Sequence, residues 1–218
     1  EINPIALAAT FFELDRRLPR SSLMMKLLPD LECSIADYRQ DGFVIFRGLF
    51  DSNRIAAVDA EVRDLPKRLP DLVRPNNLRC RFRTHVESGD SIFETFDPIV
   101  DLSAGCRLLA YDERLAGVLQ GVYGEPARLF KDKLIYKPPG AEGYPLHQDY
   151  IAWSGFPRSF LTVLIPLESA DESNGCTVCY SGYHTQGFLS PEDGRFHPLD
   201  VAAFDSARAV PLILEPGD

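Results

Sequence analysis

The spacing of apolar positions predicts helices in the first half of the chain. The clearest repeat follows a capping residue at 51 or 52 and runs through Ile55, Val58, Val62 and Leu65. The same period recurs near 112–122, which predicts a second helix. The stretch "PIALAATFFELDRR", residues 4–17, is predicted as an amphipathic helix that ends before a proline.

Other apolar runs have the character of strands. Residues 41–50, "DGFVIFRGLF", are rich in Val, Ile and Phe after a turn signal and are predicted as a buried strand. Residues 66–103 contain four prolines and are predicted as loop with short elements. After Gly124, short β-favouring runs alternate with Pro, Gly, Asn and Asp. These runs are "ARLFKDKLIYKPPG", "RSFLTVLIPLES", "NGCTVCYSG" and "VPLILEPGD".

This order of elements, helices first and closely spaced strands afterwards, favours a mainly β protein with flanking helices. A jelly-roll core with helices packed on its outside fits the pattern. The length of 218 residues suits a single domain. Within it, residues 1–123 are expected to form a helical and mixed part that packs on the barrel, and residues 124–218 the jelly-roll strands.

Composition narrows the class of partner. The net charge of -9 repels phosphate backbones, so nucleic acid is not expected as a partner. No apolar run approaches the ~20 residues of a membrane span, so no membrane association is expected. Five scattered cysteines fit a reducing, cytoplasmic location. The pair in "CTVC", 176–179, has no second pair for zinc and is interpreted as buried strand cysteines.

The stretch "YPLHQDYIAW", 144–153, carries the main candidate chemistry. His147 and Asp149 are two residues apart, and in a strand they would point to the same face. An imidazole and a carboxylate at one point make two thirds of the 2-His-1-carboxylate set that holds ferrous iron. An ordinary hydrogen-bonded pair is the alternative.

The order of several motifs resembles the phytanoyl-CoA dioxygenase family. The resemblance covers roughly residues 37–218, and its most specific parts are "YKPP" followed by "HQD", and "NGC" before a glycine-histidine loop. It implies a double-stranded β-helix that binds Fe(II) and 2-oxoglutarate and uses O2 to hydroxylate a C–H bond. It also implies that His147 and Asp149 are metal ligands. Asp149 argues against the halogenating relatives, in which a small residue replaces the carboxylate.

The same resemblance places the third ligand, a histidine, and the arginine that clamps 2-oxoglutarate after the "GD" at the end of the recorded chain. Both are therefore expected beyond Asp218, and the recorded sequence is interpreted as truncated before the last strands. His184 and His197 are the remaining candidates for a third ligand. For both, the simpler interpretation is a loop histidine with ordinary hydrogen bonds.

The strand "KDKLIYK" places three lysines on one face. Lys133 is predicted to contact a carboxylate of the cosubstrate or the substrate, and a solvated strand edge is the alternative. The resemblance assigns Ile135 and Leu164 to the cosubstrate pocket, although relatives often have Asn where Ile135 stands.

Two aromatic residues follow the metal motif. Trp153 and Tyr150 are candidates for lining the substrate, with a place in the core as the alternative. His85 lies among arginines of "RCRFRTH", which are interpreted as a solvated strand face.

The sequence therefore predicts an Fe(II)- and 2-oxoglutarate-dependent dioxygenase that acts on a small molecule, with ascorbate as reductant in vitro. A role in natural-product biosynthesis is the suggested setting. Desaturation, epoxidation or cyclisation from the same cofactor chemistry is one alternative outcome. A non-catalytic jelly-roll binding protein is the other. The sequence indicates neither the substrate nor the oligomeric state.

Overall fold

The computed structural model describes residues 6–13, 31–149 and 159–218. Its strands are β1 (Ala6–Glu13), β2 (Cys80–Thr84), β3 (Ser91–Phe96), β4 (Ala127–Ile135), β5 (Phe160–Pro166), β6 (Val178–Tyr180) and β7 (Ala209–Pro211). Its helices are α2 (Leu31–Asp41), α3 (Ser52–Val62), α4 (Leu65–Arg68), α5 (Ala104–Ala110) and α6 (Glu113–Tyr123). Short 3-10 turns are η1 (Tyr183–Gln186), η2 (Val201–Ala203) and η3 (Ser206–Arg208).

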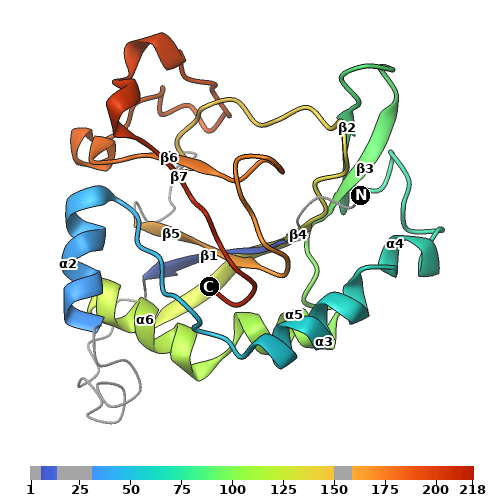
Figure 1. Ribbon diagram of the computed structural model, residues 1–218, viewed down its shortest axis with the longest axis horizontal. Helices are drawn as coiled ribbons and strands as arrows, with labels where there is room; N and C mark the ends of the chain where they lie inside the picture. The colour runs from blue at the N-terminus through green and yellow to red at the C-terminus, as the bar shows by residue number, and fades with distance from the viewer. Residues whose placement is uncertain (1–5, 14–30, 150–158) are drawn as a thin grey trace.

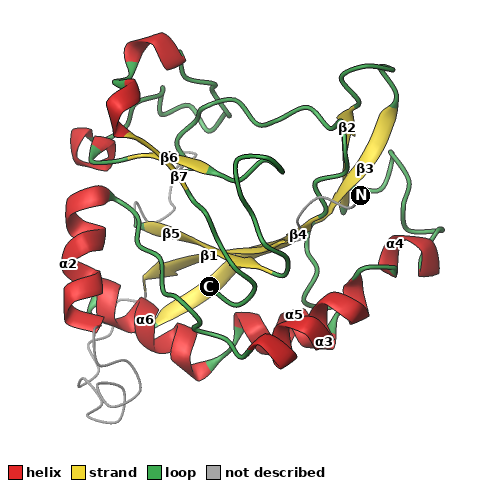
Figure 2. Ribbon diagram, viewed as in Figure 1, coloured by secondary structure: helices red, strands yellow, loops and turns green. Residues whose placement is uncertain are grey.

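Two antiparallel sheets form the β part of the molecule. The larger has the strand order β2-β3-β4-β1-β5, and the smaller pairs β6 with β7. Helices α3, α5 and α6 run along one side of the larger sheet, and the smaller sheet lies on the other side (Figure 1). Long loops connect the smaller sheet to the rest (Figure 2). The main hydrophobic core combines side chains of α3, α5 and α6 with those of the large sheet.

The first strand corrects the prediction of a helix over 4–17. Within the described part of that range, Ala6–Glu13 form β1, which pairs antiparallel with β4 on one edge and β5 on the other. Leu7 and Phe11 are buried. Alanine-rich sequence favours a helix locally, but pairing on both edges gives the backbone of a central strand hydrogen-bond partners on each side, and this tertiary gain outweighs the helix propensity.

Residues 41–50 are likewise not the buried strand that their apolar run predicts. They belong to no sheet, and Phe50 is the one residue among them that is buried. Their backbone instead holds the last turn of the chain: Phe50 N donates to Gly217 O at 2.9 Å, and Gly48 N to Asp218 Oδ1 at 2.9 Å. The run is thus an anchor for residues 215–218 and adds no strand.

The two helices with clear periodicity are confirmed. Asp51 caps α3 by accepting hydrogen bonds from two backbone N–H groups, and Ile55, Val58 and Val62 of the predicted apolar face are buried. Leu65, predicted on the same helix, is buried but begins the separate helix α4. Helix α6 ends at Gly124, which adopts φ 80°. Helices α2 and α5 were not predicted, and residues 66–103 contain more order than expected because β2 and β3 form a hairpin there.

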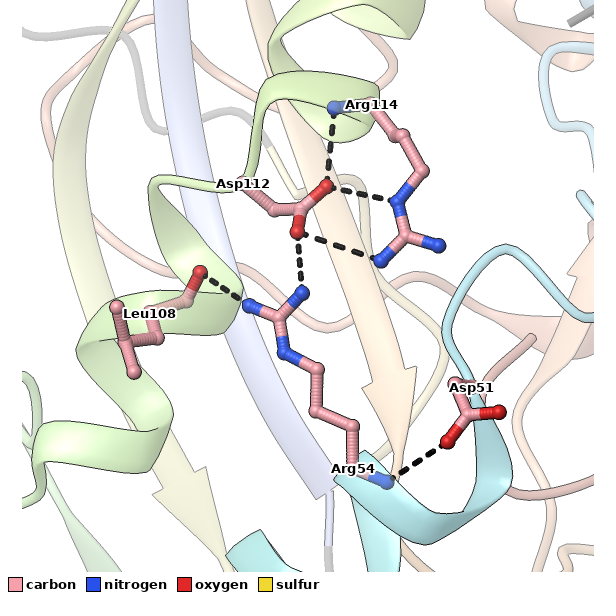
Figure 3. A network of polar contacts seen from close by, with 5 residues as sticks. All are labelled: Asp51, Arg54, Leu108, Asp112 and Arg114. Carbon is pink, nitrogen blue, oxygen red and sulfur yellow. Dashed lines mark hydrogen bonds and ion pairs between the residues drawn. The ribbon is translucent and has the colours of Figure 1, made fainter. Parts of the chain in front are cut away.

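A polar network joins α3 to the connection between α5 and α6 (Figure 3). Asp112 caps α6 through the backbone N–H of Arg114, and its carboxylate also pairs with the Arg114 and Arg54 guanidinium groups. Arg54 reaches further, to the carbonyl of Leu108 at 2.8 Å. Burial would raise the pKa of Asp112, but the hydrogen bonds from Arg114 and Arg54 outweigh it and lower the pKa to about 2.

Because the pKa of Asp112 is lowered in the folded protein, the free energy of unfolding depends on pH in the acidic range. Because the native carboxyl has the lower pKa, the network stabilises the fold at pH values above the unfolded-state pKa near 3.9. We expect this contribution, about 2 kcal/mol, to disappear as the pH falls through the native value. Urea unfolding followed by circular dichroism from pH 5 to pH 2 should show a shallower loss for Asp112→Asn. Asp71→Asn, at an exposed carboxylate, is the control and should keep the wild-type slope.

Candidate metal centre

The H-x-D motif lies in an irregular segment that follows β4, so its assignment to a strand was wrong. The segment is fixed at alternate residues by the loop 187–199. Leu199 N donates to Leu146 O at 2.7 Å, and the side-chain amide of Gln148 bonds the backbone of Gly187 and Leu189. Leu146 and Gln148 are thus bound to that loop, whereas the side chains of His147 and Asp149 approach each other.

His147 and Asp149 do converge on one point, as the sequence predicts. The imidazole Nε2 lies 3.3 Å from Asp149 Oδ1, and the other ring nitrogen, Nδ1, lies 2.8 Å from Pro145 O. A carbonyl oxygen can only accept, so Nδ1 carries the proton and donates it to Pro145. In the neutral ring, Nε2 then presents a lone pair toward the carboxylate.

This geometry fits a metal ion. Two ligand atoms at about 2.1 Å from one metal and at right angles to each other are about 3.0 Å apart, close to the observed separation. Two lone pairs facing one another need a cation or a proton between them. The hydrogen bond to a backbone carbonyl is also the support that metal-ligating histidines commonly have.

The electrostatics of the pair agree with a cation site. When Nε2 takes up a proton, it can donate a hydrogen bond to Asp149. This bond raises the pKa of His147 and lowers the pKa of Asp149, and a hydrogen bond from Thr162 also lowers the pKa of Asp149. The side chain of Asp149 is 64 % exposed and that of His147 is 27 % exposed. The pair is therefore within reach of an ion from solvent and is not sealed in the interior.

No third metal ligand is found among the residues that the structure describes. His184 packs against the end of α2, where its Nε2 lies 3.1 Å from Arg39 O. His197 Nε2 lies 2.9 Å from Asp193 Oδ1. Both have the ordinary loop contacts that the sequence suggested as the simpler interpretation, and the expectation of a ligand beyond Asp218 stays a prediction.

The cosubstrate candidates lie on the strands next to the motif. Lys133 on β4 is close enough for its charge to lower the pKa of both His147 and Asp149. Ile135, at the end of the same strand, is 8 % exposed. Leu164 on β5 is half-buried and pairs with Ala8 of β1. On its other edge, Ala8 pairs with Lys133 of β4, so Leu164 and Lys133 lie at the same level of the sheet with β1 between them.

The other lysines of β4 do not share one environment. Lys131 pairs with Asp97 at 3.0 Å, and Lys137, beyond the end of the strand, donates to Gly175 O at 2.6 Å. Lys133, in contrast, forms no hydrogen bond or ion pair with any residue that the structure describes.

A polar cluster that the sequence did not single out lies beside the motif. Glu94, 2 % exposed, accepts hydrogen bonds at Oε2 from the Tyr144 hydroxyl at 2.8 Å and from Arg83 Nε at 3.3 Å. The Arg83 guanidinium carbon lies 3.4 Å from the centre of the Tyr144 ring. The ring centres of Tyr144 and His147 are 6.4 Å apart. The interpretation of Arg83 as part of a solvated strand face is therefore wrong.

The remaining candidates have structural roles or lie elsewhere. Tyr150 and Trp153 lie outside the described residues. His85 Nδ1 accepts from the backbone N–H groups of the turn after β2. Cys179 lies in β6 but Cys176 precedes it, and both are only half-buried thiols, so the buried-strand interpretation holds for neither.

Fold and site together give a sheet-rich core with flanking helices and one histidine and one carboxylate that face each other. The family model for phytanoyl-CoA dioxygenase (PhyH) matches residues 38–218. The chain belongs to this family, which confirms the resemblance seen in the sequence.

Curated relatives support the same class. The chain is 26% identical over 184 residues to a 2-aminoethylphosphonate dioxygenase from uncultured bacterium HF130_AEPn_1, covering 83% of this chain and 68% of that protein. It is 32% identical over 120 residues to a methylphosphonate hydroxylase from Gimesia maris, covering 55% of this chain and 45% of the relative. The chain thus spans between about half and two thirds of the length of these relatives.

A solved structure confirms the fold. The epimerase SnoN, crystallised with Fe3+, alpha-ketoglutarate and nogalamycin RO, superposes with a TM-score of 0.59 at 20% sequence identity, covering 87% of this chain and 72% of that one. The predicted mainly β, jelly-roll core with flanking helices is therefore correct. The description of the family and the names of these relatives agree with the dioxygenase class that the sequence predicts. Within the described residues, no helix is long and apolar enough to cross a membrane.

Proposed function

We propose that this protein is an Fe(II)- and 2-oxoglutarate-dependent dioxygenase that hydroxylates a C–H bond of a small molecule. The observation that carries the proposal is the convergence of His147 Nε2 and Asp149 Oδ1, with Nδ1 tied to Pro145 O so that the lone pair of Nε2 is free for a metal. Membership of the family supports iron as that metal. A hard carboxylate with an imidazole is also a donor set that suits ferrous iron.

In this proposal the residues have distinct tasks. His147 and Asp149 hold the iron, which with 2-oxoglutarate and O2 supplies the oxidising chemistry when bound. Pro145 O fixes the imidazole, and the Thr162 hydroxyl supports Asp149. Lys133 is the candidate for binding a carboxylate of cosubstrate or substrate.

The walls of the site are proposed from β4, β5 and the segment after the motif. Ile135 and Leu164 are proposed to line the cosubstrate pocket from the two strands that flank β1. Tyr150 and Trp153 remain proposed contacts for the substrate. A side chain without polar atoms at position 135 excludes water but offers no hydrogen bond, so Lys133 carries more of the polar recognition.

A different oxidative outcome is the second candidate. The matched solved structure is named as an epimerase, although it was crystallised with iron and alpha-ketoglutarate. The same cofactor chemistry can therefore end in a product other than an alcohol. Product mass separates the outcomes, because hydroxylation adds one oxygen, desaturation removes two hydrogens and epimerisation leaves the mass unchanged.

The substrate is proposed to be a small molecule. The names of several relatives include 2-aminoethylphosphonate, methylphosphonate, hypophosphite and ectoine. These are compact compounds, which supports a small rather than a macromolecular substrate.

Cosubstrate turnover tests the proposal. Purified protein, given Fe(II), 2-oxoglutarate, O2 and ascorbate, is expected to form succinate, which is measured by mass spectrometry. Adding a chelator should stop succinate formation, and restoring Fe(II) should recover it. Succinate formation that continues at the same rate in the presence of chelator, or none at all with iron present, would count against the proposed function.

A further inference from the structure

The residue between the two proposed metal ligands is bound to a loop that lies about forty residues later in the chain. The side-chain amide of Gln148 donates to Gly187 O at 2.9 Å and accepts from the backbone N–H of Leu189 at 3.0 Å. A glutamine can form both bonds because its amide carries a donor and an acceptor. The two bonds together fix the start of the loop 187–199 relative to the metal motif.

The same loop makes two further contacts with the motif. Leu199 N donates to Leu146 O at 2.7 Å. The ring of Phe196 lies 5.1 Å from the imidazole of His147, centre to centre, which is a normal distance for two packed rings. The loop 187–199 therefore contacts residues 146, 147 and 148 and follows the motif along its length.

The loop has no core of its own. Residues 187–199 form neither helix nor strand, and none of them is buried. Stretches of about 12–15 residues without regular structure are uncommon in compact domains, and many of them are functional. Segments with few buried apolar contacts open at a low cost in free energy. The position of such a loop depends on its hydrogen bonds, and Gln148 supplies two of them.

Gln148 holds the loop without competing for the metal. Its neighbours His147 and Asp149 approach each other, with Nε2 3.3 Å from Oδ1, whereas the amide of Gln148 is bound to the loop. When His147 and Asp149 hold a metal ion, the backbone of residue 148 between them is held as well. A better-fixed Gln148 is a better partner for the loop, and a coupling of this kind acts equally in both directions.

We propose that Gln148 is a positioning residue that couples the loop 187–199 to the metal centre. Metal binding then favours the loop closed against His147, and the closed loop strengthens metal binding. Phe196 packs against the imidazole in the closed position and shields it from solvent. This inference rests on the proposed function for the metal and adds a conformational step to it.

Limited digestion with trypsin reports on the loop. Arg195 is the one lysine or arginine in residues 187–199, and it is exposed. The rate of cleavage after Arg195, followed by mass spectrometry, measures how often the loop opens. In metal-free protein, Gln148→Met keeps a side chain of similar length but loses both hydrogen bonds, so we expect cleavage about tenfold faster than in the wild type.

The response to metal separates coupling from a merely structural role. Fe(II) alone, added without oxygen or 2-oxoglutarate, is expected to slow cleavage of the wild type at least about threefold, the effect of one hydrogen bond. In Gln148→Met we expect this ratio to fall to about one. Fe(II) binding, measured by anaerobic equilibrium dialysis, should weaken by the same factor. A glutamine that only stabilises the loop would change both cleavage rates and leave their ratio as in the wild type.

Gln186→Met is the matched control, since Gln186 is an exposed glutamine of η1, one residue before the loop. It should keep the wild-type cleavage rates, their ratio and the affinity for Fe(II). A wild-type ratio in Gln148→Met, or an equal fall of the ratio in both variants, would overturn the inference. Circular dichroism checks folding. If Gln148→Met does not fold, Gln148→Asn, whose shorter amide cannot span both partners, carries the same prediction.

The inference and the proposed function can fail separately. Protection of Arg195 by Fe(II) that depends on Gln148, in a protein that forms no succinate, would leave the coupling standing and remove the oxygenase. Iron-dependent succinate formation in a protein whose cleavage after Arg195 ignores Fe(II) would do the reverse. A wild type that binds no Fe(II) would overturn both.

Discussion

His147→Ala is expected to lower iron-dependent succinate formation by more than about 100-fold. Changes to groups that merely support a ligand already cost 10–100-fold in affinity or activity, and His147 is proposed as a ligand itself. Its loss would also remove the imidazole that lies 3.3 Å from Asp149. The measurement is the rate of succinate formation at saturating 2-oxoglutarate across a range of Fe(II) concentrations.

His197→Ala is the matched control for that variant. His197 also forms a histidine–aspartate pair, at 2.9 Å from Asp193, but this pair lies four residues apart on an exposed loop. We expect His197→Ala to retain succinate formation within about twofold of the wild type, since surface changes are usually near neutral. Equal losses in the two variants would show that the distinction between the pairs is mistaken.

Asp132→Ala is expected to give the largest loss of stability, about 3 kcal/mol in the free energy of unfolding. Asp132 is 5% exposed, and its Oδ1 accepts from the backbone N–H groups of Ile99 and Val100 at 2.6 and 2.9 Å. The alanine would leave both N–H groups without this acceptor, one of them at the fully buried Ile99. The unfolding midpoint in urea, with its slope, measures the change.

Asp132→Asn separates the hydrogen bonds from the charge. Its amide oxygen can still accept from Ile99 and Val100, so we expect a loss smaller than that of the alanine variant. Asp101→Ala, nearby and 48% exposed, should change stability by less than about 1 kcal/mol. An Asp132→Ala protein as stable as the wild type would show that the hydrogen bonds from Asp132 to Ile99 and Val100 do not stabilise the fold.

The helices and strands that the sequence predicts correctly are those whose signals are local. The buried face of α3 and its cap at Asp51 lie within one stretch of chain, as do the repeat and terminal glycine of α6. The same is true of β4 and β5, which are bounded by turn residues. Where a periodic apolar face and its end signals agree, the element forms as predicted.

The errors in the fold have a common cause in distant partners. Ala6–Glu13 becomes a strand because β4 and β5, more than a hundred residues later, offer it two edges. Residues 41–50 do not form the predicted strand, and the backbone N–H groups of Gly48 and Phe50 donate to residues 217 and 218 instead of to a neighbouring strand. The division of the chain at 123 and 124 stays a prediction.

The candidate site shows the same division. The convergence of His147 and Asp149 was predictable from their spacing, since alternate residues share a side in any extended segment, with or without a ladder. The cluster of Arg83, Glu94 and Tyr144 was not, because a bulge in β3 and a loop fifty residues later bring it together. An arginine run on a strand carries no signal of which member turns inward.

The most direct test of the central claim is a crystal structure of the protein grown without oxygen in the presence of Fe(II), with anomalous data at the iron edge. We expect a single strong iron peak about 2.1 Å from both His147 Nε2 and Asp149 Oδ1. An iron peak elsewhere, or no iron peak beside His147 and Asp149 in crystals grown with Fe(II), would contradict this claim.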